Sequence, residues 1–144
     1  MALTNYAENK IVDAVLRGQA LGAPATWYVA LFTAAPTDIG AGTEVSGGSY
    51  ARVAVTASLA NFAGTQAAAS TTASSGTGGQ TSNNAAITFP APTANWGSVT
   101  HAMLMDASTS GNGWIHGALT TPKTVNNGDA APSFAIGELV ITFS

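Results

Sequence analysis

The sequence has no cysteine and very few charged residues. Without cysteine the chain can form neither disulfide bonds nor thiolate metal sites, and cysteine usage says nothing about the redox compartment. Only 8% of its 144 residues are charged and 46% are hydrophobic, whereas roughly 25% of residues are charged in typical soluble domains. A domain with so few ionic groups would be poorly soluble if its whole surface faced water. We therefore expect neighbouring protein chains to cover much of this surface.

Basic residues are too scarce for a nucleic-acid partner. Four cations, Lys10, Arg17, Arg52 and Lys123, are scattered among seven carboxylates, and the net charge is −3. Phosphate binding needs a basic patch, and the sequence has none. No apolar run approaches the roughly 18 residues of a membrane-spanning helix. The start, MALTNYAENK, also lacks the apolar core of a signal peptide. We expect neither nucleic acid nor a membrane as a partner.

Hydrophobic periodicity predicts one N-terminal helix over residues 4–18. Asn5 and Glu8 have the form of a capping box, and Gly18 suits the left-handed position that follows a helix end. The apolar residues of one helix face are Ile11, Val12, Val15 and Leu16. This face either packs on the helix's own domain or docks on another subunit.

The rest of the chain is patterned as short strands. Residues 26–33, TWYVALFT, have apolar side chains on both faces, which indicates a strand covered on both sides or a strand covered on one side by a partner. Further strands are predicted within 50–56, 85–92, 99–107, 113–119 and 138–144, with Leu139, Ile141 and Phe143 toward the core. We predict a single mainly β domain over residues 1–144, an antiparallel β-sandwich or jelly-roll-like fold with one N-terminal α-helix.

Residues 63–86, AGTQAAASTTASSGTGGQTSNNAA, have no charge, no aromatic ring and no aliphatic side chain larger than alanine. Such a segment buries too little apolar surface to offset its ordering entropy, so alone in water it should be mobile. Its small side chains let two backbones approach closely. We expect an extended low-complexity arm that lies in a groove of a neighbouring chain, and the alternative is a flexible surface loop.

No pattern of catalytic or metal-binding residues stands out. His101 and His116 would be diagonal neighbours, roughly 7–8 Å apart, if residue 101 lay opposite residue 118 in a hairpin. They lack the close spacing of metal ligands, so we predict hydrogen-bonded histidines and no metal site. No serine lies in a nucleophile elbow, and the glycine-rich stretches match no phosphate-binding motif. We expect no catalytic or cofactor site and no enzymatic activity.

Trp96, in the stretch TANWGS, is an aromatic residue for which the sequence allows three roles. It belongs to the core or anchors an interface, and these two roles are favoured over a sugar-stacking platform because no cluster of acids or amides accompanies it. The predicted partner-interface residues are Ile11, Val15, Ala67, Thr71, Ser75, Gly78 and Trp96.

Five segments together resemble a family of small virion proteins of tailed bacteriophages, many of which are described as tail fibre proteins. They are LTNYAENKIVDAVLRG, APATWYVALFTAAPTD, GTEVSGGSYARVAV, ITFPAPTANWGSVTHAMLMDA and HGALTTPKTVNNGD. The likeness covers most of residues 3–143 but not about 58–80. None of these segments is a functional motif, so the resemblance transfers no site residue. It implies a structural component of the virion, made in the cytoplasm of the bacterial host.

The position on the virion is predicted from what the chain lacks. A long fibre needs a shaft, and this sequence has neither heptads nor repeats. We predict a capsid decoration, or cement, protein that bridges capsomers, with the major capsid protein and further copies of itself as partners in a homo-oligomer. The alternative is a short tail fibre or tail-associated adhesin that binds a glycan of the host surface.

Overall fold

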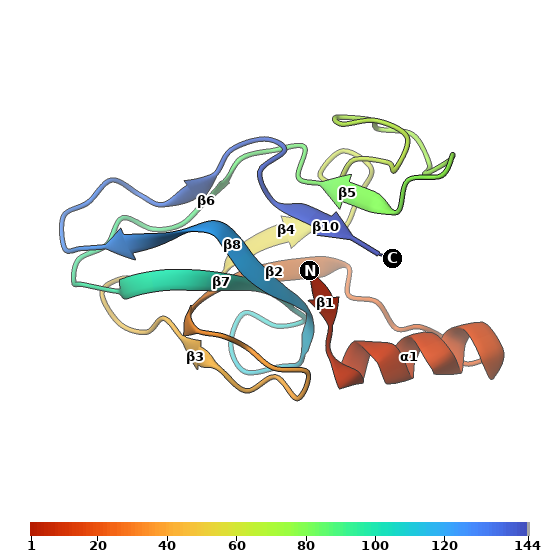
Figure 1. Cartoon of the computed structure of the whole chain (residues 1–144), viewed down its shortest axis with the longest axis horizontal. Helices are drawn as coiled ribbons and strands as arrows, with labels where there is room; N and C mark the ends of the chain where they lie inside the picture. The colour runs from red at the N-terminus through yellow and green to blue at the C-terminus, as the bar shows by residue number, and fades with distance from the viewer. Residues whose placement is uncertain (144) are drawn as a thin grey trace.

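A computed structural model describes residues 1–143 (Figure 1). The chain is mainly β, every strand pair is antiparallel, and the helix is N-terminal, so the predicted fold class is confirmed. The elements are β1 (Ala2–Leu3), α1 (Asn5–Leu16), β2 (Thr26–Ala34), β3 (Thr43–Glu44), β4 (Val53–Thr56), β5 (Gln80–Ser82), β6 (Ile87–Thr88), β7 (Gly97–Met105), β8 (Gly113–Val125), β9 (Ser133–Phe134) and β10 (Val140–Thr142).

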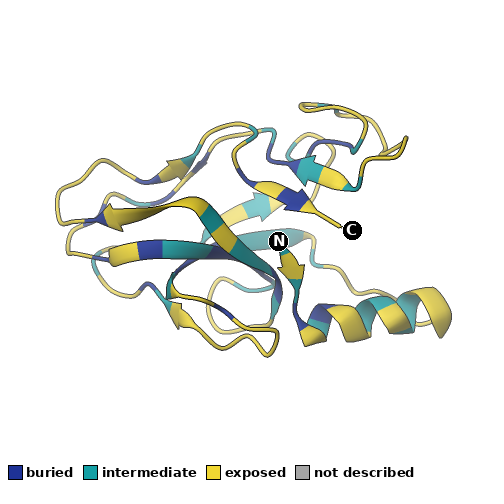
Figure 2. Cartoon of the chain, viewed as in Figure 1, coloured by how far each residue is buried: buried dark blue, intermediate teal, exposed yellow. Residues whose placement is uncertain are grey.

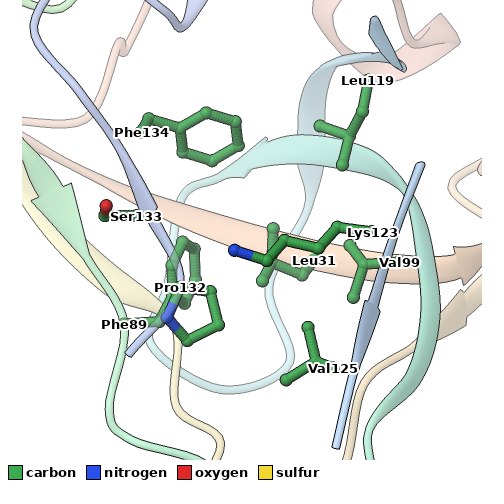
Figure 3. Close-up of a pocket in the computed structure, with 9 residues that line it drawn as sticks. All are labelled: Leu31, Phe89, Val99, Leu119, Lys123, Val125, Pro132, Ser133 and Phe134. Carbon is green, nitrogen blue, oxygen red and sulfur yellow. The ribbon is translucent and has the colours of Figure 1, made fainter. Parts of the chain in front are cut away.

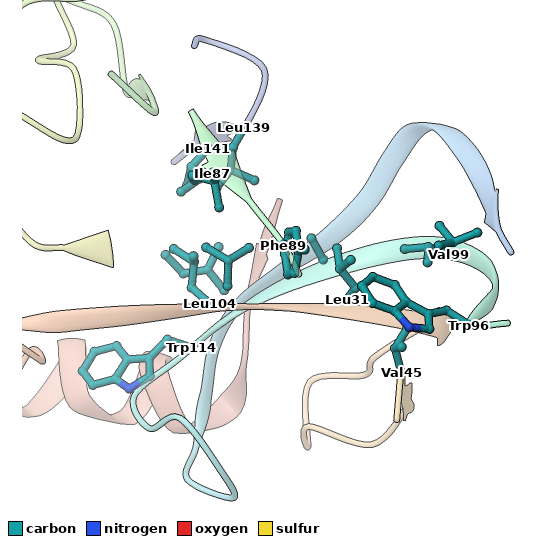
Figure 4. Packing of buried hydrophobic residues seen from close by; sticks show 14 of the residues in the cluster. Leu31, Val45, Ile87, Phe89, Trp96, Val99, Leu104, Trp114, Leu139 and Ile141 are labelled. Atoms are coloured by element: carbon teal, nitrogen blue, oxygen red, sulfur yellow. The ribbon is translucent and has the colours of Figure 1, made fainter. Parts of the chain in front are cut away.

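The strands form one large sheet and two short ribbons. The six-stranded sheet has the order β1-β8-β7-β2-β3, and β4 also pairs with β2, beside β3. The ribbons, β5–β10 and β6–β9, have two strands each. Side chains of the ribbons and of the large sheet meet in one hydrophobic cluster (Figure 4), so the ribbons form the second layer of an open sandwich. The cluster includes Val29, Leu31, Ile87, Phe89, Val99, Leu104, Trp114, Leu139 and Ile141.

The other face of the large sheet carries a second, smaller cluster. Ala30 and Phe32 of β2 are buried there against Met103 and Met105 of β7. The loop after β2 covers part of this face, because Gly42 approaches so closely that an added Cβ would lie 3.1 Å from the Phe32 ring. Both faces of β2 are therefore covered, as predicted, and at Phe32 the chain's own loop provides the cover.

The helix begins differently from the prediction. Its N-cap is Thr4 and not Asn5, because the Thr4 hydroxyl accepts a hydrogen bond from the amide of Ala7, at 3.3 Å, and donates one to the carbonyl of Gly113, at 2.6 Å. Thr4 is buried, so the cap also fixes the helix start onto β8. The end agrees with the prediction, since Gly18 follows the C-cap with a φ of 68°.

The low-complexity segment is joined to the domain at both ends. Ala63 and Gly64 are buried, and the amide of Ala63 donates to the carbonyl of Ser82. At the other end, residues 80–82 form β5 and pair with β10. Only the part between these ends, residues 66–78, lies outside the body as a loop, which Figure 1 shows turning back on itself near the C-terminus.

A buried amide, that of Asn83, connects this segment to the second layer. Its Nδ2 donates to the carbonyls of Ala85 and Ala135, at 2.8 and 2.9 Å, and its Oδ1 accepts from the amide of Leu139, at 2.9 Å. The Asn83 side chain thus ties together the chain after β5 and the turn that leads into β10. At the far end of β10, Phe143 is half exposed, so the prediction that it faces the core is wrong.

Candidate interaction surfaces

The C-terminal half of α1 exposes an apolar stripe. The exposed fractions of Val12, Val15 and Leu16 are 47%, 72% and 77%. Successive residues of a helix are about 100° apart around its axis, so these three side chains share one side. We call them the α1 stripe. In Figure 2 the helix becomes mostly exposed away from its first turn.

A different side of the helix packs on the domain. Ala7, in the first turn, is fully buried, and the Tyr6 ring meets Trp114 of β8 edge to face, with 5.5 Å between ring centroids. The only strands that α1 contacts are β1 and β8, among residues 1–143. The hydrophobic surface of the stripe is therefore not needed for the fold of a single chain.

Two of the predicted interface residues lie on this helix. Val15 is in the α1 stripe, and Ile11 lies at its border, half-buried. Of the two alternatives for this apolar face, packing on the helix's own domain does not hold for Val15 and Leu16, which are among the most exposed large hydrophobic residues of residues 1–143. Their contact with a partner stays a prediction.

Four other predicted interface residues, Ala67, Thr71, Ser75 and Gly78, are all exposed on the loop 66–78. Within this loop, Gln66 Nε2 donates to the hydroxyls of Ser70 and Thr72, both at 2.7 Å. Its Oε1 accepts from the amide of Ser75, at 3.3 Å. These bonds lie within the loop and are exposed to water, and the Ser70 carbonyl also accepts from the amide of Gly64 and from Asn84 Nδ2 beside the loop. Whether a partner binds the loop stays a prediction.

Beside the loop lies a shallow apolar hollow of about 380 Å³. Leu59 and Phe143, both half exposed, line it together with Phe62. This hollow adds a second exposed apolar area at the base of the low-complexity segment.

Trp96 is not part of any surface, which corrects its prediction as an interface residue. It is 6% exposed, its Nε1 donates to the carbonyl of Gly48 at 3.0 Å, and its ring meets Tyr50 edge to face. A ring that stacks on a sugar must expose at least one face, and the Trp96 ring, packed in the core cluster, exposes neither.

One apolar cavity opens between β8 and β9 (Figure 3). Its volume is about 60 Å³, and the stem of Lys123 lies among its apolar walls. Pockets for small organic ligands usually measure 300–1,000 Å³, so this cavity has room for little more than a water molecule or two. Its lining residues are Leu31, Phe89, Val99, Leu119, Lys123, Val125, Pro132, Ser133 and Phe134.

The two histidines share a face of the sheet but have separate partners. Residue 101 lies opposite Ala118, which is the register that makes His101 and His116 diagonal neighbours. His101 Nδ1 is 2.8 Å from the Thr100 hydroxyl, and His116 Nε2 is 3.4 Å from Asp38 Oδ1. Within residues 1–143 no three His, Asp or Glu side chains are grouped so that they could hold a metal ion. Over the same residues no helix is long and apolar enough to span a membrane.

The most connected polar group is one that the sequence analysis missed, the side chain of Arg52. It forms a bidentate ion pair with Glu44, with two nitrogen–oxygen distances of 2.8 Å. Its Nη1 also donates to the carbonyls of Ala107 and Ser110, both at 2.7 Å. Hydrogen bonding to Glu44 raises the pKa of the Arg52 guanidinium above its ordinary value. We call this group of contacts the Arg52 clamp, because it fastens the loop between β7 and β8 to β3 and β4.

Two neighbouring groups complete the environment of the clamp. Burial is the main cause that raises the pKa of Tyr50, whose hydroxyl donates to Glu44 and accepts from the amide of Leu31. For Asp106, burial acts to raise the pKa, but hydrogen bonds from Asn112 and Trp114 outweigh it, and the pKa is lowered. Every one of these groups is satisfied by the protein itself, and the arrangement positions a loop.

Comparison with known families identifies the chain. A family model described as podophage GP4 fiber I protein gp80 matches residues 2–142. The chain belongs to this family. The match confirms the prediction of a small bacteriophage virion protein, and it includes residues 58–80, where the resemblance in the sequence did not extend. The family indicates a fibre-type protein located in the virion. A search of curated proteins finds no match.

Proposed function

We propose that this chain is a small, non-enzymatic structural subunit of a bacteriophage virion, attached to a neighbouring protein subunit through the α1 stripe. The observation that carries the proposal is the exposure of Val15 and Leu16 on a helix that packs on its own domain with another side. Burying a fully exposed aliphatic side chain contributes about 1.5–3 kcal/mol. Covering the α1 stripe would therefore contribute several kcal/mol to attachment.

The helix also gains order from such a partner. An isolated helix shorter than about 12–15 residues is marginal in water, and α1 has 12 residues. Its first turn is fixed by Thr4 and Tyr6, whereas Val15 and Leu16 of its last turn are largely exposed. A neighbouring subunit packed on the stripe would supply the tertiary contacts that the last turns lack.

We place the subunit at the tail, as part of a short fibre, because the family to which it belongs is described as a fibre protein. In this position the domain would bind a glycan of the host surface.

Capsid decoration is the second candidate, and the compactness of the chain favours it. The residues described, 1–143, form an open sandwich with one short helix and contain no element long enough to be a shaft. In this case the partners are the major capsid protein and further copies of this chain. The α1 stripe would then bridge capsomers.

A copy count per virion, with heads and tails separated, distinguishes the two positions. We expect a few copies in the tail fraction and none on tailless heads. Hundreds of copies on tailless heads would establish capsid decoration instead.

The same particles test the attachment surface, because particles assembled with Val15→Asp or Leu16→Asp should lose the subunit. The matched control is Ile136→Asp, which places the same charge on an exposed apolar residue outside the helix. Normal incorporation of both helix variants would overturn the proposed role of the α1 stripe.

A further inference from the structure

We infer that a polar cavity beside the start of α1 binds one neutral sugar ring of a glycan. The inference rests on the proposed function, in which the domain binds a glycan of the host surface, and it specifies the binding site and the chemical class of the sugar. The cavity has a volume of about 330 Å³ and is lined by the first residues of α1, the loop after β2 and the loop after β7. We call it the polar cavity.

The size and position of the polar cavity suit a single ring. Pockets for small organic ligands begin at about 300 Å³, so this one holds one ring of a longer glycan. Figure 1 shows the loop between β2 and β3 and the loop between β7 and β8 side by side next to the start of α1. Val15 of the α1 stripe lies about 14 Å along the helix axis from Tyr6, which lines the cavity. A subunit attached through the stripe therefore need not cover the cavity.

Side chains that line the cavity offer hydrogen-bonding groups that have no protein partner. Asp38 Oδ1 is 3.4 Å from His116 Nε2, but Asp38 Oδ2 has no partner within residues 1–143. Asn112 Nδ2 donates to Asp106, which leaves Asn112 Oδ1 to the cavity. The side chain of Asn5 is exposed, and over the same residues its amide forms no hydrogen bond. A sugar hydroxyl both donates and accepts, so the hydroxyls of one ring can bond the carboxylate and both amides.

An apolar side chain at the cavity suits the C–H face of the same ring. Ile39 is 80% exposed, more than any other large hydrophobic residue that the structure describes, and it lines the cavity. Met105, which is buried, lines it as well. Sugar rings have hydroxyl groups at their edge and C–H groups on their faces. Aliphatic surface beside a few fixed polar groups is the combination that such a ligand needs.

The charge of the cavity selects a neutral sugar. Within residues 1–143 the cavity is lined by no lysine, arginine or histidine, and the Asp38 carboxylate would repel an acidic sugar. The helix start does not offset this repulsion, because the amides of Asn5, Ala7 and Glu8 already donate to protein oxygens. We therefore expect hexoses, deoxyhexoses or N-acetylhexosamines to bind in preference to uronic acids.

Both walls of the cavity are in place before a ligand binds. The loop after β7 is fastened by the Arg52 clamp and by Asp106, whose Oδ1 accepts from the amide of Asn112 at 2.7 Å. The loop after β2 is closed by a hydrogen bond from the amide of Thr37 to the carbonyl of Ala41, also at 2.7 Å. A cavity that is already formed loses little conformational entropy when it binds a ligand.

Titration of the isotope-labelled full chain, followed by NMR, tests the inference. The neutral probes are free glucose, galactose, mannose, rhamnose and N-acetylglucosamine, and glucuronic acid and calcium chloride are titrated separately. With at least one neutral sugar we expect saturable shifts of the backbone amides of Gly40, Gly111 and Asn112, which line the cavity. Glucuronic acid and calcium chloride should leave these amides unchanged.

Variants of the lining residues assign the binding to the cavity. Asp38→Ala removes a charged acceptor and should weaken binding at least about tenfold, whereas Asn5→Ala removes a neutral group and should weaken it about threefold. The matched controls are Asp13→Ala and Asn9→Ala, which remove the same groups from positions of α1 outside the cavity. Asn5→Ala keeps the test decisive if Asp38→Ala lowers the thermal midpoint, because the Asn5 side chain bonds no other part of the fold and the N-cap is Thr4.

Each outcome decides the inference. Saturable shifts with a neutral sugar that weaken in Asn5→Ala and persist in Asn9→Ala support it. It is overturned if no neutral sugar shifts the cavity amides, if glucuronic acid binds more tightly, or if calcium chloride alone gives the shifts. Equal affinities of Asn5→Ala and Asn9→Ala would also overturn it. If Val15→Asp is lost from virions but the cavity binds no sugar, this inference fails and the proposed attachment stands.

Discussion

Two loops of similar composition are held in very different ways. The loop between β7 and β8, with the sequence DASTSGN (106–112), and the loop 66–78 both consist mainly of small residues. The first is fastened by the Arg52 clamp, whose guanidinium side chain is 8% exposed. The second has only neutral hydrogen bonds, most of them exposed to water, which are made by Gln66 within the loop and by Gly64, Thr65 and Asn84 beside it. Composition alone therefore does not determine how firmly a loop is held.

The difference lies in the environment of the anchoring group. A hydrogen bond that water can replace contributes little net stability, whereas a charged donor that is shielded from water leaves costly unsatisfied groups when it is lost. We expect the clamped loop to open only with the whole domain. The loop 66–78 should open locally at low free-energy cost.

The largest expected effect comes from Arg52→Met. The change leaves the Glu44 carboxylate and the carbonyls of Ala107 and Ser110 without their partner, so the free energy of unfolding should fall by about 3 kcal/mol. Arg52→Lys should lose less, since it keeps the charge but not the bidentate geometry. Urea denaturation followed by tryptophan fluorescence measures both values.

The control for this prediction is Arg17→Met. Arg17 also pairs with a carboxylate, but its side chain is 70% exposed, so its loss should cost no more than about 0.5 kcal/mol. Equal losses for Arg52→Met and Arg17→Met would show that the burial of the clamp has no energetic consequence, and the contrast between the two loops would then be unfounded.

The clamped loop also predicts a dependence on pH. Because the pKa of Asp106 is lowered in the folded chain, its contribution to stability is complete above the unfolded carboxyl pKa, about 4. This contribution is lost as the pH falls through the folded pKa. Asp106→Asn removes it, because an amide cannot ionise, and should cost about 1 kcal/mol at neutral pH.

The measurement for Asp106 is urea denaturation at pH 7 and pH 3. The difference in unfolding free energy between the two pH values should be smaller for Asp106→Asn than for wild type. An identical difference in the two proteins would mean that the hydrogen bonds from Asn112 do not favour the ionised carboxylate.

The predictable parts of the fold were the strands and the helix whose sequences have a regular hydrophobic periodicity. Alternation over residues 26–33 predicts a strand covered on both faces, and the apolar pattern of the β7–β8 hairpin is compatible with the observed register of His101 opposite Ala118. Periodicity also locates α1. It cannot say whether an apolar helix face meets its own domain or a partner, which is why the exposure of the α1 stripe became known only from the structure.

The unpredicted parts depend on single polar side chains that reach distant backbone. Asn83 lies in a stretch of serine and asparagine that looks like a loop, yet its amide bonds groups about 50 residues away. Alternation with Val53 and Val55 predicts only that Arg52 points away from the core, and the loop after β7 covers that outward side. Hydrogen bonds of this kind leave no periodic signal. The scarcity of charge was the one available hint, because an isolated arginine and glutamate in such a chain have few other partners.

The smallest expected effect is that of Gln66→Ala, which tests the other side of the comparison. The change removes the bonds to Ser70 and Thr72 and the acceptor of the Ser75 amide, but water replaces each of them. The free energy of unfolding should change by no more than about 0.5 kcal/mol. Hydrogen exchange should nevertheless become faster at Ser75, while the amide of Leu31, which donates to Tyr50 in the core, stays unchanged. If Gln66→Ala destabilised the domain as much as Arg52→Met, the loop 66–78 would be an integral part of the fold, and its role as a surface available to partners would need a different basis.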